Sequence, residues 1–225
     1  MARAETMDEK YLVVDHLIKW FGSDRAVDDV SFSIEKGKFL TLLGPSGCGK
    51  TTTLMSIAGL HTIDSGEIRV GDVIYTSREK KIFLAPEKRD IGMVFQSYAI
   101  WPHMTVAQNV AYPLEIRKIE RVEIDERVDK VLALVGLTEM SDKLATQLSG
   151  GQQQRASLAR AIVSNPLLLL FDEPLSNLDL KLREQMRVEL KRIQNEVGIT
   201  SIYVTHDQSE ALVMSDEIIV MSKGQ

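Results

Sequence analysis

The segment Gly44-Pro45-Ser46-Gly47-Cys48-Gly49-Lys50-Thr51 decides the fold of this chain. It matches the pattern G-x-x-x-x-G-K-[ST] at every fixed position. An apolar run at residues 39–43 comes directly before it, and a helical pattern over 50–60 follows it. A strand, a glycine loop and a helix in this order predict that backbone N–H groups bind phosphate at the positive end of the helix. The alternative is a glycine turn that happens to carry a lysine.

The side chains of this loop suit the polyphosphate of a nucleotide. Glycine lets successive N–H groups turn toward phosphate oxygens. Lys50 supplies a positive charge for the β- and γ-phosphates, and the Thr51 hydroxyl can ligate Mg²⁺. Thr52 is placed to hold the inner phosphates, and Cys48 occupies a variable position. The predicted nucleotide-binding residues of the loop are Ser46, Gly47, Cys48, Gly49, Lys50, Thr51 and Thr52.

Two carboxylates, Asp172 and Glu173, follow a second apolar run at residues 167–171. The carboxyl ends of buried strands are where open α/β sheets bind their ligands. One carboxylate is needed for Mg²⁺, often through water, and another can orient and deprotonate an attacking water molecule. Taken alone, the pair fits an ordinary polar strand end before Pro174 equally well.

A second glycine-rich segment, Leu148-Ser149-Gly150-Gly151-Gln152, precedes a helical pattern that runs to residue 163. Ser149 is predicted to cap this helix, and the glycines leave backbone N–H groups uncovered. The segment therefore predicts a second helix N-terminus able to bind an anion. A simple helix cap is the usual interpretation of Ser-Gly-Gly.

Together, the phosphate loop, the segment 148–152 and the acidic strand end resemble the ATP-binding cassette (ABC) ATPase family. This resemblance implies that Asp172 binds Mg²⁺ and that Glu173 is the general base. It also implies that two chains pack head to tail on binding ATP. Each chain then contacts the nucleotide of its partner in trans through Ser149, Gly150, Gly151 and Gln152.

Four further matches extend the resemblance along the chain. Phe21 stands where the family places an aromatic ring against adenine, although the neighbouring Trp20 is an alternative. Gln96 resembles the family glutamine that contacts Mg²⁺ or the attacking water, and His206 the histidine that hydrogen-bonds the γ-phosphate. The segment Ser176-Asn177-Leu178-Asp179 resembles the loop that crosses the dimer interface, and its aspartate is also predicted to cap the following helix.

Strands alternate with helices along most of the chain, which predicts an α/β fold with a mostly parallel sheet. The predicted strands cover residues 11–17, 27–34, 39–43, 68–70, 73–75, 91–95, 167–171, 200–205 and 217–221. The early strands favour a small antiparallel β subdomain with a hairpin at Gly71-Asp72. The family resemblance implies the P-loop NTPase (RecA-like) fold.

One nucleotide-binding domain is expected over residues 1–225. Its core is predicted at about 1–96 and 160–225, and an inserted helical subdomain at about 97–159, with a predicted helix over 179–197 belonging to the core. The resembled importers usually carry a C-terminal regulatory domain, which is not expected within residues 1–225.

Composition restricts the kinds of protein that remain. The net charge of −5 argues against a nucleic-acid partner, and the single cysteine cannot form an intrachain disulfide. No apolar run approaches the roughly 20 residues that span a bilayer. The charged N-terminal segment does not resemble a signal peptide. A cytoplasmic protein is therefore expected.

Three segments, at residues 96–106, 171–179 and 203–208, resemble the importer subunits that serve sugars, ferric iron and polyamines. This resemblance implies ATP and Mg²⁺ as cofactors, a homodimer, transmembrane permease subunits and an external solute-binding protein. It places the chain on the inner face of the cell membrane. The resembled importers receive a short helix of the permease in a groove, for which the suitable residues are Tyr98, Ile100, Trp101 and Met104.

Other ABC classes remain as alternatives. One is a soluble ABC ATPase without a transport role, and another is an exporter cassette. Repair members insert a long coiled coil between the two glycine motifs, whereas Lys50 and Ser149 are only 99 positions apart. Translation members carry two cassettes, and this chain has one. A regulatory nucleotide-binding module without catalysis is a further alternative. Glu173 argues against it, because a site that does not hydrolyse ATP could dispense with this carboxylate.

Overall fold

The computed structural model describes residues 10–225, which form two compact units. The first unit comprises residues 10–90 together with Gly198–Gln225, and the second comprises Ile91–Val197. Each unit is defined by the contacts among its own residues. The helical subdomain predicted at 97–159 stays a prediction.

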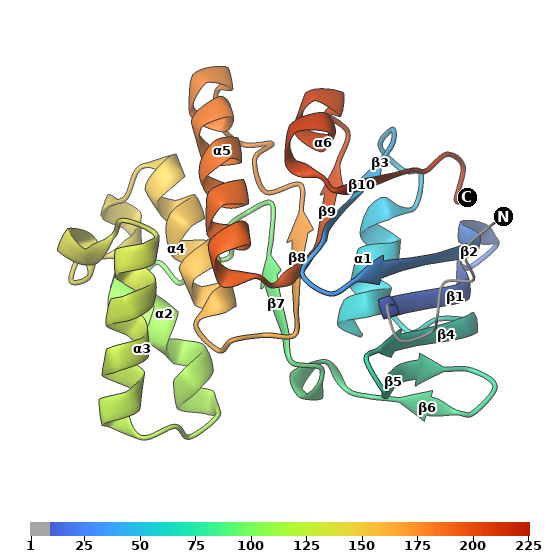
Figure 1. The fold of residues 1–225 in the computed structure, drawn as a ribbon, viewed down its shortest axis with the longest axis horizontal. Helices are drawn as coiled ribbons and strands as arrows, with labels where there is room; N and C mark the ends of the chain where they lie inside the picture. The colour runs from blue at the N-terminus through green and yellow to red at the C-terminus, as the bar shows by residue number, and fades with distance from the viewer. Residues whose placement is uncertain (1–9) are drawn as a thin grey trace, which may run out of the picture. The chain divides into compact units, whose positions relative to one another are not determined.

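An antiparallel sheet in the first unit has the strand order β2-β1-β4-β5-β6 (Figure 1). Its strands are β1 Lys10–Phe21, β2 Asp24–Glu35, β4 Ser65–Val70, β5 Val73–Ser77 and β6 Ile82–Phe83. Val70 pairs with Val73 across the turn at Gly71, whose φ is 53°. The antiparallel subdomain and its hairpin are therefore confirmed. Strand β6 was not predicted, because two exposed residues carry no alternating pattern.

Parallel strands in the first unit carry the phosphate loop. They are β3 Phe39–Leu43, β9 Thr200–Thr205 and β10 Glu217–Val220, in the order β10-β3-β9. Helix α1 Lys50–Ala58 begins where the loop after β3 ends. Helix α6 Gln208–Met214 contacts β3 and β9. It was not predicted, because seven residues are too few to establish a helical period.

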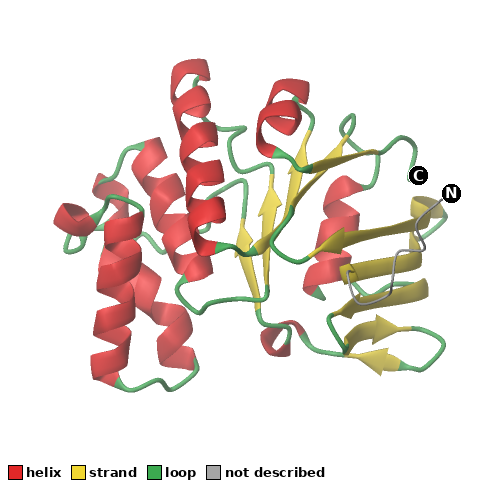
Figure 2. Cartoon of the chain, in the orientation of Figure 1, coloured by secondary structure: helices red, strands yellow, loops and turns green. Residues whose placement is uncertain are grey.

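The second unit combines two parallel strands with four helices. The strands are β7 Ile91–Val94 and β8 Leu168–Asp172. The helices are α2 Val106–Ile116, α3 Arg121–Leu134, α4 Gly150–Ile162 and α5 Leu180–Val197. Helices α2, α3 and α4 contact one another and lie side by side in Figure 2. A Cβ on Gly92 would collide with the carbonyl oxygen of Ala161, so β7 packs directly against α4.

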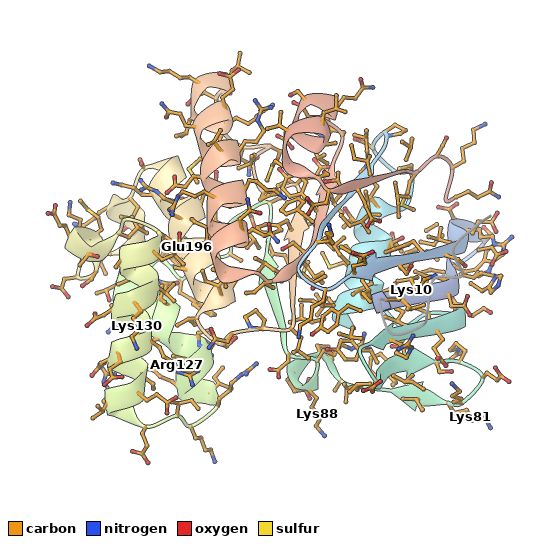
Figure 3. All side chains as sticks on the ribbon, in the orientation of Figure 1. Lys10, Lys81, Lys88, Arg127, Lys130 and Glu196 are labelled. Carbon is orange, nitrogen blue, oxygen red and sulfur yellow. The ribbon has the colours of Figure 1, made fainter. Side chains whose placement is uncertain are left out.

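The predicted fold class is confirmed: the pairings β10–β3, β3–β9 and β7–β8 are parallel, and a separate sheet is antiparallel. Short 3₁₀ helices occur at Pro86–Lys88, Thr138–Met140 and Ala145–Gln147. Charged side chains project from α3, among them Arg127 and Lys130 in Figure 3. Within residues 10–225, every helix is too short or too polar to cross a membrane.

Candidate nucleotide-binding site

The phosphate loop takes a course that requires glycine. Gly47 has φ 78° and Gly49 has φ 100°, both in the left-handed region. A Cβ on Gly49 would collide with the carbonyl oxygen of Ala26, and one on Gly44 with that of Met221. The buried strand β3 on one side and α1 on the other anchor the loop between them. The local fold is thus the strand, loop and helix that the sequence predicts.

Lys50 is buried, and its ammonium lies inside the loop that precedes it. Nζ donates hydrogen bonds to the carbonyl oxygens of Gly44 at 2.7 Å and Pro45 at 2.8 Å, and it lies 3.8 Å from Cys48 Sγ. The positive charge is therefore held close to the N-terminus of α1, where the helix dipole is also positive. Thr51 and the loop residue Ser46 are exposed. This combination suits a polyanion.

His206 follows β9 directly and is exposed. Leu43 at the end of β3 pairs with Thr205 at the end of β9, and the two strands are parallel. The phosphate loop and His206 therefore leave neighbouring strands at the same end of the sheet. Asp207 then caps α6, since its carboxylate accepts hydrogen bonds from the backbone N–H groups of Ser209 and Glu210.

Two exposed aromatic residues, Trp20 and Phe21, end strand β1. The Phe21 ring makes an edge contact with the ring of His61, with centroids 5.4 Å apart. The Lys19 ammonium lies 5.2 Å from the Phe21 centroid. Asp64 accepts a hydrogen bond from the Trp20 backbone N–H at 2.7 Å. The aromatic pair is thus tied to the loop that follows α1.

In the second unit, the predicted catalytic residues follow two neighbouring strands. Val94 pairs with Phe171 in the parallel pair β7–β8, so Gln96 lies at the same end of the strands as Asp172, the last residue of β8, and Glu173. The Asn177 side-chain amide donates to the carbonyl oxygen of Gln96 at 2.8 Å. Glu173 has φ 44°, a strained value for a residue with a side chain, and such strain clusters at functional sites.

The glycine-rich segment 149–152 begins α4 as predicted, with Ser149 as its N-cap. Gln152 N–H donates to Ser149 Oγ at 3.4 Å, and Ser149 N–H donates to Gln152 Oε1 at 2.9 Å. A Cβ on Gly150 would lie 3.3 Å from Leu178 Cδ2. The absence of side chains at the start of α4 therefore lets the loop 176–179 approach it closely.

The predicted site residues fall into two groups, one in each unit. In the first unit, the phosphate loop 44–52 and His206 share one end of the parallel strands, and Phe21 lies at the loop after α1. In the second unit, the structure brings together Gln96, the segment 149–152, the carboxylates at the end of β8 and the loop 176–179. The roles assigned to these residues stay predictions.

Sequence reasoning missed a cavity of about 310 Å³ beside the Gln96 segment. Of the four residues predicted for a partner groove, only Trp101 lines it, and Tyr98 is buried. Arg160 from α4 also lines the cavity and is itself mostly buried. No sequence signal marks Arg160, because a buried arginine on a helix has the same pattern as an exposed one.

Residues 27–176 match the family described as "ABC transporter". The chain is 56% identical over 206 residues to the trehalose/maltose import ATP-binding protein MalK of Thermococcus litoralis. It is 51% identical over 219 residues to the spermidine/putrescine import ATP-binding protein PotA of Pseudomonas aeruginosa. These alignments cover 92% and 97% of this chain but 55% and 59% of the relatives, so the chain spans little more than half their length.

A solved structure, cbiO1 from Clostridium perfringens, described as part of the ABC transporter complex cbiONQ, has a TM-score of 0.84 and 30% sequence identity to this chain. The alignment covers 96% of this chain and 86% of cbiO1. At this coverage the similarity extends over both units. By sequence and by fold, this chain belongs to the ABC transporter family of ATP-binding proteins.

Proposed function

We propose that this chain is the ATP-hydrolysing subunit of an importer and that it binds MgATP at the interface of a head-to-tail dimer. One observation carries the proposal. Two helices begin at glycine-rich segments: α1 has Gly49 as its N-cap, and α4 begins with Gly150 and Gly151 after its N-cap Ser149. A nucleotide needs one of them for its phosphates, and the other is available to the nucleotide of a partner chain.

Binding of ATP rests on the loop and on the start of α1. The N–H groups after Gly47 and Gly49 surround the phosphates, and the Lys50 ammonium exchanges its carbonyl contacts for phosphate oxygens. Phe21 stacks on the adenine. The exposed hydroxyl of Thr51 and the half-buried carboxylate of Asp172 are oxygen donors of the kind that Mg²⁺ prefers. When bound, Mg²⁺ supplies charge neutralisation at the β- and γ-phosphates.

Hydrolysis rests on the residues that end the parallel strands. Glu173 orients the attacking water and accepts its proton. Gln96 would contribute a second hydrogen bond to this water or its side-chain oxygen as a ligand of the metal, and His206 donates a hydrogen bond to the γ-phosphate. In the partner chain, Ser149 and the glycines after it direct N–H groups at the charge that develops in the transition state.

The importer assignment rests on the relatives. Proteins named for the import of trehalose/maltose, spermidine/putrescine and Fe(3+) ions are 50–56% identical to this chain over 92–97% of its length. By this likeness, the dimer works on the inner face of the membrane with transmembrane permease subunits and an external solute-binding protein. Residues 1–225 form the nucleotide-binding domain, with the helical subdomain at 97–159.

The catalytic part is tested with Glu173→Gln. This variant should bind ATP with unchanged affinity, lose at least about 100-fold in kcat, and accumulate as an ATP-bound dimer. Glu184→Gln, which changes an exposed carboxylate on α5, is the matched control and should behave as the original chain. Turnover by Glu173→Gln at the control rate would remove Glu173 as the base.

The shared site is tested with Ser149→Arg in the Glu173→Gln background. The added side chain covers the start of α4 and should prevent the ATP-induced dimer, measured by sedimentation, while ATP binding to the monomer persists. ATP-driven dimers of this double variant would contradict the trans role. Co-purification of permease subunits from native membranes then separates an importer from a soluble ABC ATPase, and the direction of transport separates it from an exporter cassette.

A further inference from the structure

The chain just after Gln96 makes a turn that residues with side chains avoid. Tyr98 has φ 60° and Ala99 has φ 49°, so two successive non-glycine residues are left-handed. Contact between Cβ and the following carbonyl makes this conformation costly for L-residues. Such residues persist only where the surrounding structure holds them in place.

Two side chains of α4 bind both carbonyl groups of the turn. Ser157 Oγ donates to the Tyr98 carbonyl oxygen at 2.8 Å. Arg160 donates from one terminal nitrogen to the same oxygen at 3.0 Å and from the other to the Ala99 carbonyl oxygen at 2.7 Å. Ser157 is fully buried and Arg160 is 9% exposed. At this burial the three bonds are protected from competition with water.

The segment on both sides of the turn is also held. Asn177 binds the carbonyl oxygen of Gln96, and Asn109 bonds to both the N–H and the carbonyl group of Trp101. The guanidinium carbon of Arg160 lies 4.7 Å from the Trp101 ring centroid, within cation–π range. Arg160 is thus the residue that contacts both the turn and the indole beyond it.

We infer that Ser157 and Arg160 are positioning residues that hold the left-handed turn at Tyr98 and Ala99 and so determine the course of the chain at Gln96. The inference rests on the proposed function, in which Gln96 acts at the hydrolytic site. Because Ser149 is the N-cap of α4, the same helix carries the segment offered to the partner's nucleotide. The packing of α4 against the turn at Tyr98 and Ala99 therefore sets the position of Gln96.

The test uses a compensating substitution. Arg160→Met should lower kcat for ATP hydrolysis about tenfold and leave the Kd for ATP within about twofold, because the phosphate loop is not part of the contact. Ala99→Gly removes the conformational cost of the turn and should recover about threefold of the loss in Arg160→Met. Lys118→Gly, at another left-handed residue with φ 57°, is the matched control and should recover nothing.

Structure is followed separately through Trp101 in a Trp20→Phe background, since the chain has two tryptophans. Arg160→Met should increase acrylamide quenching of Trp101, and Ala99→Gly should reverse the increase. If Arg160→Met does not fold, Ser157→Ala and Arg160→Lys are measured with the same two glycine variants. Recovery that is equal with Ala99→Gly and Lys118→Gly, or absent from both, overturns the inference.

These outcomes are distinct from a failure of the proposed function. Normal turnover by Glu173→Gln would refute the hydrolytic site, and Trp101 quenching would still decide whether Arg160 holds the turn. Loss of turnover by Glu173→Gln together with no recovery by Ala99→Gly would refute the positioning role alone.

Discussion

Thr205 donates a hydrogen bond from Oγ1 to the carboxylate of Glu210 over 2.6 Å, and this bond holds the chain next to His206. The Tyr203 hydroxyl donates to the same carboxylate at 2.9 Å, and the Asp207 N–H donates to Thr205 Oγ1 at 3.0 Å. Glu210 is 4% exposed, so its hydrogen bonds compete little with water. The residues on both sides of His206 are therefore linked to one buried carboxylate.

Replacing Glu210 by alanine should destabilise the protein and reduce turnover. Two buried hydroxyl groups lose their acceptor, which lowers the free energy of unfolding by about 3 kcal/mol. Glu210→Gln retains an acceptor oxygen and should cost less. Urea denaturation measures the change, and Glu217→Ala, at an exposed carboxylate of β10, is the control. Equal stability of Glu210→Ala and Glu217→Ala would refute the role of this network.

Asp64 should contribute a stability that depends on pH. The Trp20 backbone N–H lowers the pKa of Asp64, burial opposes this, and the Lys19 ammonium adds to it. Because the folded pKa lies below the unfolded one, the contribution is complete above the unfolded value near 4 and disappears as the pH falls through the folded pKa.

The variant Asp64→Asn tests this dependence. The difference in unfolding free energy between the original chain and Asp64→Asn should be constant from pH 7 to about pH 5 and should shrink below about pH 4. Asp72→Asn, at the exposed turn between β4 and β5, is the control. A difference for Asp64→Asn that grows as the pH falls would contradict the assigned sign.

The affinity for ATP distinguishes Phe21 from Trp20 as the residue that contacts adenine. Phe21→Ala should raise the Kd for ATP about tenfold, since stacking of a base on an aromatic ring contributes about 1–3 kcal/mol. Trp20→Ala should change it less than about twofold if the adenine contact lies at Phe21, as the family resemblance implies. Calorimetric titration with ATP measures both variants. A larger effect for Trp20→Ala would transfer the adenine contact to Trp20.

Arg89 is a fully buried arginine that caps the C-terminal end of α1. Its guanidinium donates to the carbonyl oxygens of Ser56 at 3.1 Å and Ile57 at 2.8 Å, and to that of Leu84 at 2.7 Å. Gly59 has φ 81°, and a Cβ there would collide with the guanidinium. The helix that begins at the phosphate loop is therefore held at its other end by one side chain.

Arg89→Lys should lower the free energy of unfolding by about 3 kcal/mol, because one ammonium cannot reach acceptors spread around a planar guanidinium. Gly59→Ala should be destabilising as well, through the collision and the left-handed φ. Lys88→Met, at an exposed neighbour, should remain within about 0.5 kcal/mol of the original chain. Denaturant unfolding measures all three, and an Arg89→Lys variant as stable as Lys88→Met would refute the capping role.

Much of the fold could be predicted because its signals are local. The runs at 39–43 and 167–171 are apolar apart from Thr41, and they correspond to β3 and, shifted by one residue, to β8. Ser149 and the glycines after it carry a capping pattern within four residues, and the cap formed. The misses, β6 and α6, are too short to show a period. Strand β6 forms by pairing with the nearby β5, and α6 packs against β3 and β9.

Some residues of the candidate site could likewise be predicted from the sequence, and others could not. The phosphate loop and the acidic strand end could be recognised because their chemistry requires particular residue types at a fixed spacing. Arg89 and Arg160 could not be recognised, since charge normally predicts exposure and both are buried. The contact of Asn177 with Gln96 joins residues 81 positions apart, and no local pattern announces it.

By itself, the sequence determined the α/β class, the two helix N-termini at glycine-rich segments and the residue types that can bind a nucleotide. Only the tertiary structure decided that Ser157 and Arg160 bind the turn at Tyr98 and Ala99. The physical reason is the separation in sequence between the residues that interact. Strand, helix and loop propensities act between neighbours in the chain. A left-handed turn of residues with side chains is stable only when donors some 60 positions away satisfy its carbonyl groups.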